Sequence, residues 1–155
     1  MSKTVLAIDP GPKESAYCLW DGERILEKGK VPNEELMGML YEWGLESKPP
    51  RLFIEMVASY GMAVGAEVFE TVFWLGRFYE MYLGHVYRVY RLAIKMHHCH
   101  QAKANDSNIR QALIDRLGEP GVKKNPGVTY GVSKDVWSAL AIAVYAYDCY
   151  EELTK

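Results

Sequence analysis

The chain contains 155 residues, of which 49% are hydrophobic and 25% charged, and its formal net charge is −2. A chain of this size and composition is typical of an ordinary globular protein, and we expect residues 1–155 to form a single domain. The three cysteines lie far apart and form no CxxC pair, which argues against a secreted disulfide scaffold and a zinc ribbon. No apolar run reaches the roughly 18 residues of a membrane span, and the start does not resemble a signal peptide, so we expect a soluble cytoplasmic protein without a membrane partner.

Charge is distributed unevenly along the chain. Residues 85–134 carry nine Lys and Arg against three Asp and Glu, a net charge of +6, whereas residues 31–84 carry −5. This asymmetry permits a nucleic-acid-binding face on a protein that is acidic overall, although a solvated basic face would have the same composition.

The first third of the sequence predicts an antiparallel meander. Residues 3–8 form a short apolar strand that ends at Asp9, where Asp-Pro-Gly-Pro turns the chain. Residues 14–20 and 24–31 flank Asp21-Gly22, a two-residue signal for a β-hairpin. Asn33 is then expected to cap a helix over residues 34–45, and Pro49-Pro50 stops the chain before a buried strand over residues 51–56.

Helices and strands alternate in the rest of the chain. The pattern predicts a helix over 63–83 that is dense in aromatic side chains, a strand over 85–94, a helix over 106–117 capped by Asp106 or Ser107, a loop over 118–131, and a last helix from its cap Ser133 to about residue 153. A meander followed by such an alternation predicts an α/β layer fold in which helices cover a mixed sheet.

Three acidic residues occupy positions where the predicted strands and helices do not need a charged side chain. Asp9 ends a central apolar strand, Glu55 lies near the end of a second one, and Asp135 lies in the first turn of the last helix. A carboxylate at the end of an apolar strand costs free energy to desolvate unless a partner compensates it, and a hard divalent cation such as Mg²⁺ is a suitable partner. Asp9 could instead be a turn-forming residue, and Asp135 a helix N-terminal acid, so Glu55 has the weakest structural explanation.

Four segments, in this order, carry a family resemblance. They are Ala7-Ile8-Asp9-Pro10-Gly11 on the first strand, Phe53-Ile54-Glu55 on the fourth strand, Leu75-Gly76-Arg77 on the long helix, and Asp135 to Ala143 on the last helix. Over almost its whole length the chain resembles the RuvC-type Holliday junction resolvases. The resemblance implies a ribonuclease H-like fold with a mixed five-stranded sheet flanked by helices, a homodimer, and cleavage of four-way DNA junctions with Mg²⁺ or Mn²⁺. It also implies that Asp9, Glu55 and Asp135 are catalytic and bind the metal.

The last helix departs from the family pattern at one position. The family usually has two acids three positions apart on this helix, and here Asp135 is followed at that spacing by Ser138. Positions i and i+3 share a helix face, so the Ser138 hydroxyl could hold a metal-bound water in the catalytic site, but it supplies no charge. Whether one or two ions bind is therefore left open. Asp106 could replace the missing charge, although its position before Ser107 and Asn108 favours a helix cap.

The loop after Glu55 and the basic segment are the candidate nucleic-acid contacts. In the family this loop reaches into the junction and stacks on bases, and here it offers Tyr60, which could equally pack on its own helix. The predicted phosphate contacts are Lys95, Lys103, Lys123, Lys124 and Lys134. The run from His97 to His100 is unsuited to one metal ion, because neighbouring side chains point to different faces, and we expect it at the mouth of the basic face.

Two other functions remain open beside a junction resolvase. One is another ribonuclease H-like nuclease that acts on RNA/DNA hybrids or on branched DNA in general, and the other is a non-catalytic junction-binding protein, which Ser138 makes plausible. An actin-like or sugar-kinase-like phosphotransferase is disfavoured, because such folds need a second similar half. The expected location is the cytoplasm of a bacterial or phage-infected cell.

Overall fold

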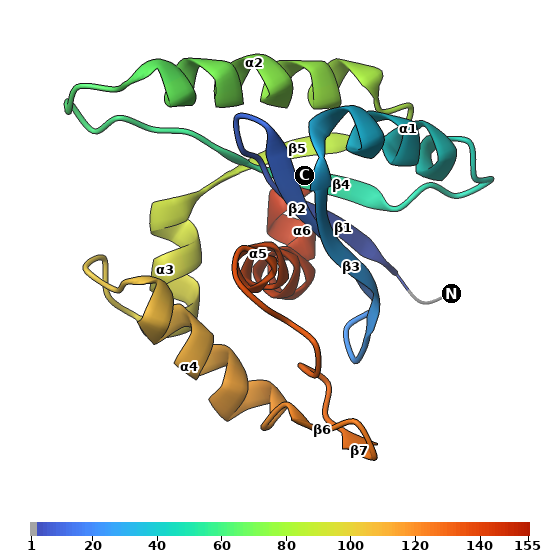
Figure 1. Cartoon of the computed structure of the whole chain (residues 1–155), viewed down its shortest axis with the longest axis vertical. Coiled ribbons are helices and arrows are strands. Elements are labelled where there is room, and N and C mark those ends of the chain that lie inside the picture. Colours follow the sequence, from blue (N-terminus) through green and yellow to red (C-terminus); the bar gives the residue numbers. More distant parts are fainter. Residues whose placement is uncertain (1–2) are drawn as a thin grey trace.

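A five-stranded mixed sheet forms the centre of the structure, a computed structural model that describes residues 3–155 (Figure 1). Its strands are β1 (Val5–Asp9), β2 (Glu14–Trp20), β3 (Ile25–Pro32), β4 (Arg51–Met56) and β5 (Val86–Tyr90). They lie in the order β3-β2-β1-β4-β5, with antiparallel pairing among the first three and parallel pairing of β1 with β4 and of β4 with β5. The predicted meander and mixed sheet are confirmed.

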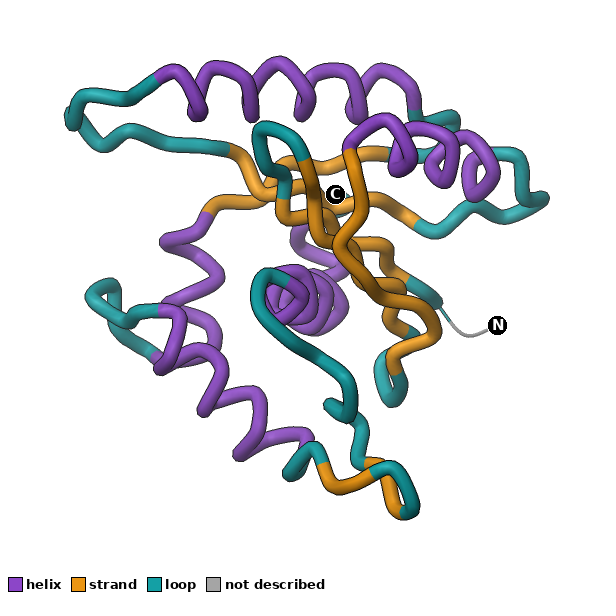
Figure 2. Tube along the Cα trace, viewed as in Figure 1, coloured by secondary structure: helices purple, strands orange, loops and turns teal. Residues whose placement is uncertain are grey.

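Helices cover both faces of this sheet (Figure 2). They are α1 (Asn33–Gly44), α2 (Ala66–Met81), α3 (Arg91–Cys99), α4 (Asp106–Leu117), α5 (Val136–Asp148) and α6 (Tyr150–Leu153). Helices α1 and α2 lie on one side, and α3, α4 and α5 lie on the other (Figure 1). A hairpin of two very short strands, β6 (Gly121–Val122) and β7 (Asn125–Pro126), connects α4 to α5. No helix within residues 3–155 is long and apolar enough to span a membrane.

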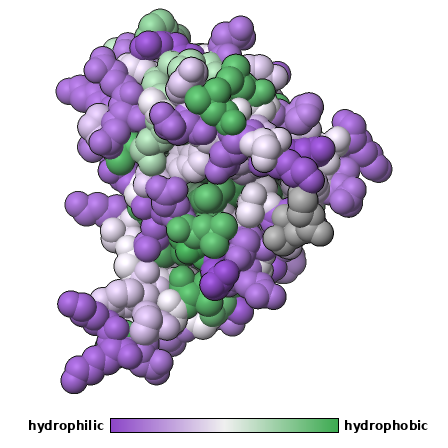
Figure 3. All heavy atoms as spheres, turned by 90° about the vertical axis from the view of Figure 1, so that its right-hand side faces the viewer, coloured by the Kyte–Doolittle hydropathy of each residue, from purple (hydrophilic) through white to green (hydrophobic). Residues whose placement is uncertain are grey.

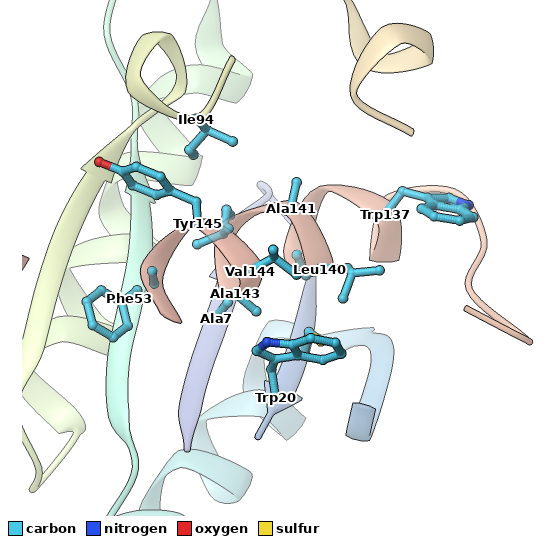
Figure 4. Close-up of a cluster of buried hydrophobic side chains, with 14 of the residues drawn as sticks. Ala7, Trp20, Phe53, Ile94, Trp137, Leu140, Ala141, Ala143, Val144 and Tyr145 are labelled. Carbon is cyan, nitrogen blue, oxygen red and sulfur yellow. The ribbon is translucent and has the colours of Figure 1, made fainter. Parts of the chain in front are cut away.

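The alternation of side chains along the strands produces two cores. On β1, Leu6 and Ile8 pack toward α1 and α2, whereas Val5 and Ala7 pack toward α5. Helix α5 is apolar almost all round because it is buried between the sheet and α3 and α4, and Figure 4 shows it among side chains such as Trp20, Phe53 and Ile94. Burial on both faces explains why β1 and β4 read as continuous apolar runs.

The turn after β1 is held by a buried hydrogen-bonded network. The Ser15 hydroxyl donates to Asn33 Oδ1 (2.6 Å), and Asn33 Nδ2 donates to the carbonyl of Gly11 (2.9 Å). The backbone N–H of Gly11 donates in turn to Ser15 Oγ (3.1 Å). A Cβ on Gly11 would come within 2.3 Å of the carbonyl oxygen of Glu14, so only glycine fits this turn. The network fixes the chain directly after Asp9.

Several predicted helix caps are wrong. Asn33 is the first residue of α1 and its side chain makes the turn network instead, because the Gly11 carbonyl and the Ser15 hydroxyl take its amide. Asn105, not Asp106 or Ser107, caps α4, since it forms a reciprocal pair of hydrogen bonds with Asn108. The N-cap position of α5 is Asp135 rather than Ser133, and no side chain caps this helix end.

Other element boundaries also differ from the prediction. The strand predicted over 85–94 ends at Tyr90, where α3 begins, so its last four residues are helical. The long aromatic helix is shorter than predicted, and the last helix breaks at Cys149 into α5 and α6. The end of β5 at Tyr90 matters for the site. Arg91, predicted to lie within a strand, is instead the first residue of α3, directly after the strand.

Candidate active site

The carboxyl ends of the parallel strands β1, β4 and β5 meet at one edge of the sheet. Ile8 on β1 is in register with Ile54 on β4, and Asp9 and Glu55 are the next residues along these adjacent strands. Because side chains alternate between faces, Asp9 lies on the same face as Ala7, and Glu55 on the same face as Phe53. Both acids therefore lie on the α5 side of the sheet, at its edge.

Asp135 comes to the same region from α5. It occupies the N-cap position with helical backbone angles, yet its side chain accepts no capping hydrogen bond. Its carboxylate is about half exposed and receives a 2.6 Å hydrogen bond from Lys30 Nζ on β3. A capping role therefore does not explain Asp135.

We refer to Asp9, Glu55 and Asp135 as the acidic group, because Glu55 and Asp135 both act electrostatically on Asp9. Burial first, and then the negative charges of Glu55 and Asp135, raise the pKa of the Asp9 carboxyl from 3.8 to about 7. Arg91 and Lys30 oppose that rise but do not cancel it. Burial also raises the pKa of Glu55, against the lowering effect of Arg91. The site therefore holds more negative charge than its basic residues neutralise.

Two basic residues that the sequence analysis did not select contact these acids. Arg91 lies 3.6 Å from a carboxylate oxygen of Glu55 and also pairs with Asp106, so its guanidinium connects the two carboxylates. Lys30 pairs with Asp135. These partners come from distant positions in the sequence, and the strand predicted over 85–94 had hidden the place of Arg91 directly after β5.

Asp106 and Ser138 lie beside Asp135 at a cavity between the first turns of α4 and α5. This α4–α5 cavity has a volume of about 310 Å³. Its lining consists of Asp106, Ser107, Ile109, Arg110, Lys134, Asp135, Trp137 and Ser138. The structure thus brings the residue that departs from the family pattern close to a second acid from another helix.

The donor set has the chemistry that a hard divalent cation prefers. Asp9, Glu55 and Asp135 offer carboxylate oxygens, and the raised pKa of Asp9 reflects charge repulsion and burial that a bound cation would relieve. Within residues 3–155, however, no group of three or more His, Cys, Asp and Glu side chains is arranged to hold a metal ion. Glu55 and Asp135 are each paired with a basic side chain instead, so a metal ion would compete with Arg91 and Lys30.

A second cavity, of about 430 Å³, adjoins Glu55 on the other side of Arg91. Its lining includes Glu55, Tyr60, Arg91, Leu92 and Lys95. Tyr60 lies on the loop between β4 and α2, which projects beyond the sheet in Figure 2, and 68% of its surface is exposed. The alternative in which Tyr60 packs against its own helix is therefore not observed, and Tyr60 and Lys95 lie close to the acidic group.

The other predicted lysines are spread over one end of the molecule. Lys134 lines the α4–α5 cavity, and Lys103 lies on the exposed turn between α3 and α4. Lys123 and Lys124 lie on the turn of the β6–β7 hairpin, at the lower end of the molecule, where Figure 3 shows hydrophilic side chains projecting.

The histidine run makes structural contacts within the protein. His97 pairs with Asp148 (2.7 Å), and His98 Nε2 lies 2.8 Å from the carbonyl oxygen of Ala141. Both contacts attach α3 to α5. His97 and His98 therefore hydrogen-bond to α5, while their place at the mouth of a basic face stays a prediction.

Comparison with solved structures defines the fold. The structure of Thermus thermophilus RuvC superposes with a TM-score of 0.62 at 19% sequence identity, and the match covers 96% of both chains. T. thermophilus RuvC in complex with a Holliday junction substrate gives a TM-score of 0.65 at 18% identity, again over 96% of both chains. No protein-family model and no curated protein sequence matches the chain. The chain therefore has a RuvC-type, ribonuclease H-like fold, as its resemblance predicted.

Proposed function

We propose that this protein is a structure-selective endonuclease that resolves four-way DNA junctions by metal-dependent hydrolysis of phosphodiester bonds. One observation carries the proposal, namely the electrostatically coupled group of Asp9, Glu55 and Asp135 at the strand edge of a RuvC-type fold. A similar fold bound to a Holliday junction supports branched DNA as the substrate. Residues 3–155 act as one nuclease domain in this proposal, and the protein works on DNA in the cytoplasm.

In this proposal Asp9, Glu55 and Asp135 hold Mg²⁺ or Mn²⁺. When bound, the metal supplies the positive charge that activates water and stabilises the leaving oxygen of a phosphodiester. The protein's own residues set its position, because Asp9 and Glu55 lie on rigid adjacent strands and Asp135 lies at the start of a buried helix. Ser138 lies one helical turn after Asp135 and is proposed to orient water through its hydroxyl.

Arg91 and Lys30 have a role that follows from their ion pairs. In the metal-free protein they neutralise part of the charge on Glu55 and Asp135, so that repulsion with Asp9 does not open the sheet edge. Glu55 and Asp135 would hold the metal in this proposal, and Arg91 and Lys30 would then be free to pair with another anion. We propose that they then contact phosphate.

The DNA-binding surface begins at the acidic group and extends over the basic segment. Tyr60 is exposed on a projecting loop and is proposed to stack on an unpaired base at the junction centre. Lys95 and Lys134 flank the site, while Lys103, Lys123 and Lys124 are proposed to contact phosphates of more distant arms. Such contacts select shape and charge rather than sequence.

Cleavage of a synthetic four-way junction tests the function. The full chain, with Mg²⁺, is incubated with the junction beside linear duplex, flap and RNA/DNA hybrid substrates of the same sequence. We expect paired cuts in the junction, and we expect Asp9→Asn, Glu55→Gln and Asp135→Asn each to lower the rate by about a hundredfold or more while junction binding is retained. Asp115→Asn, which changes an exposed acid on α4, is the matched control and should cut normally.

Each outcome decides between the alternatives. Cutting of the hybrid in preference to the junction would assign a different ribonuclease H-like nuclease. Tight junction binding without cutting in either Mg²⁺ or Mn²⁺ would assign a non-catalytic junction-binding protein. Normal cutting by the Asp9→Asn variant would remove this acidic group from the mechanism.

A further inference from the structure

The α4–α5 cavity contains a buried hydrogen-bond donor that has no acceptor. Trp137 is only 8% exposed and lines this cavity, and its Nε1 is the one buried side-chain nitrogen or oxygen within residues 3–155 that lacks a hydrogen-bond partner. Figure 4 shows the Trp137 ring beside the N-terminal end of α5. An indole nitrogen can only donate, and buried donors in native proteins are normally paired. The group that Trp137 lacks is therefore an acceptor, and the Trp137 residue lines the α4–α5 cavity.

The charges around the cavity indicate what kind of acceptor fits. Its two acids are already engaged, because Asp106 pairs with Arg91 and Asp135 pairs with Lys30. Its two cations, Arg110 and Lys134, take part in none of the ion pairs found within residues 3–155. Arg110 and Lys134 are therefore the cations at this cavity that can each pair with an anionic acceptor.

The positions of Arg110 and Lys134 also favour an anionic ligand. The guanidinium of Arg110 lies 5.1 Å from the centre of the Trp137 ring, so it is stacked over the side chain that carries the unpaired donor. Lys134 has a left-handed backbone conformation (φ 49°), which is uncommon outside glycine, and it lines the same cavity directly before Asp135. Ser107 and Ser138 add hydroxyl groups on two sides of the cavity.

The cavity volume sets the size of the ligand. About 310 Å³ corresponds to roughly ten water molecules, enough for a phosphate group with part of the adjoining sugar but too small for a base pair. Nε1 itself exposes less than 1 Å², so a ligand can reach it only if neighbouring side chains move, and Arg110 is one that lies over the ring. The cavity opens next to Asp135, at the acidic group.

We propose that the α4–α5 cavity is a binding site for one phosphate of the DNA backbone, held by Trp137 Nε1, Arg110 and Lys134. The site fixes the strand beside the acidic group without reading its sequence. The identity of the ligand as DNA rests on the proposed function, whereas the anion site follows from the unpaired donor and the unpaired cations.

The indole resonance of Trp137 reports on this site directly. In ¹⁵N-labelled protein, loss of one indole N–H signal in Trp137→Phe assigns that resonance among the four tryptophans. With EDTA present to prevent cleavage, a short single-stranded oligonucleotide should shift the Trp137 signal saturably and leave that of Trp20 in the sheet core unchanged. An oligonucleotide of the same sequence with uncharged methylphosphonate linkages should not shift it.

Affinity measurements supply the second readout. In EDTA, Trp137→Phe and Arg110→Gln should each weaken junction binding about tenfold, as expected for loss of a hydrogen bond to a charged group. Arg110→Gln should also reduce the salt dependence of binding by about one counterion. Arg24→Gln, at the exposed β2–β3 turn, is the matched control and should leave affinity and salt dependence unchanged. Unfolding curves establish that both cavity variants are folded.

The outcomes separate this proposal from the proposed function. A shifted Trp137 signal in a protein that never cuts a junction would support the phosphate site and contradict the nuclease. Junction cutting with an unmoved Trp137 signal, or with normal affinity in both cavity variants, would overturn the phosphate site alone. Failure to bind any DNA would overturn both.

Discussion

Asp9 is the residue whose chemistry depends most on its surroundings. Its pKa is raised to about 7, so between about pH 4 and pH 7 the folded protein retains a proton that the unfolded chain releases. Because the folded state binds more protons over this range, the contribution of Asp9 to stability falls as pH rises and is smallest above pH 7. The metal-free protein is therefore destabilised at this residue near neutral pH.

This predicts that Asp9→Asn stabilises the metal-free protein at pH 7.5 but not at pH 4. Relative to the original chain, the variant should gain about 2 to 4 kcal/mol of unfolding free energy at pH 7.5 in urea with EDTA. Adding Mg²⁺ should reduce this difference in unfolding free energy, because it should stabilise only the original protein. A difference between the two proteins that is independent of pH would contradict a raised pKa at Asp9.

In the proposed metal site, Ser138 is the position that carries a hydroxyl in place of a carboxylate. Mg²⁺ dehydrates reluctantly and depends on charge for binding, so a site with one carboxylate fewer should hold a second ion weakly. Ser138→Asp should therefore lower the Mg²⁺ concentration for half-maximal junction cutting, measured as a metal titration of the cutting rate. Ser138→Asn, which has nearly the same shape without the charge, is the control and should not lower it.

Asp106 is the alternative source of the negative charge that Ser138 lacks. It lines the same cavity as Ser138 and is joined to Glu55 through Arg91, so it is the first candidate for the missing charge. If metal dependence is unchanged in Ser138→Asp while cutting persists, Asp106 already supplies the fourth acid. Asp106→Asn should then raise the Mg²⁺ requirement, which the same titration measures.

The sequence predicted the candidate acids because their signals are local. Asp9 and Glu55 each follow an apolar strand, and that pattern can be recognised without knowing the fold. The partners Arg91 and Lys30 could not be found in this way, because their contacts depend on how strands and helices far apart in sequence pack together. The unpaired nitrogen of Trp137 is likewise a property of packing, and no pattern in the sequence indicates it.

At the scale of elements, the turn that follows β1 depends on a residue of α1. Asn33 is fully buried and connects the Gly11 carbonyl to the Ser15 hydroxyl, so replacing it with alanine leaves buried polar groups without partners. We expect Asn33→Ala to cost about 1 to 3 kcal/mol of unfolding free energy in urea. It should also slow junction cutting, because the same turn positions Asp9.

A surface asparagine provides the comparison. Asn125→Ala, at an exposed position on β7, should leave both stability and cutting rate unchanged. A variant Asn33→Ala with normal stability would show that the turn does not depend on this network.

The boundary between β5 and α3 shows where element prediction failed. Residues 86–94 are rich in Val, Tyr and Ile, which favours a strand, and nothing at Tyr90 signals a cap. The chain nevertheless turns helical at Arg91, because Ile94 and His98, four positions apart, then face α5 together. Tertiary packing therefore overrode local propensity, whereas β4 and α4, which have clear boundaries, were predicted with their observed ends.

At the scale of the whole molecule, α2 has a second face that the sheet does not cover. Thr71, Leu75 and Phe78 are buried against the sheet side. Phe69 and Phe73 are 66% and 57% exposed, on the same helix. Exposed aromatic side chains gathered in this way are typical of a protein–protein interface.

We therefore predict a homodimer that forms through this face of α2. A two-fold dimer would present two acidic groups to the opposing strands of a four-way junction, which a monomer cannot do. Sedimentation at micromolar concentration should show a dimer for the original chain and a monomer for the double variant Phe69→Glu/Phe73→Glu. That variant should make single nicks in place of paired cuts. Leu26→Glu, on the exposed edge strand β3, is the control and should remain dimeric. If the original chain sediments as a monomer both alone and on junction DNA, the exposed aromatic face has another role, and paired cutting must come from two independent binding events.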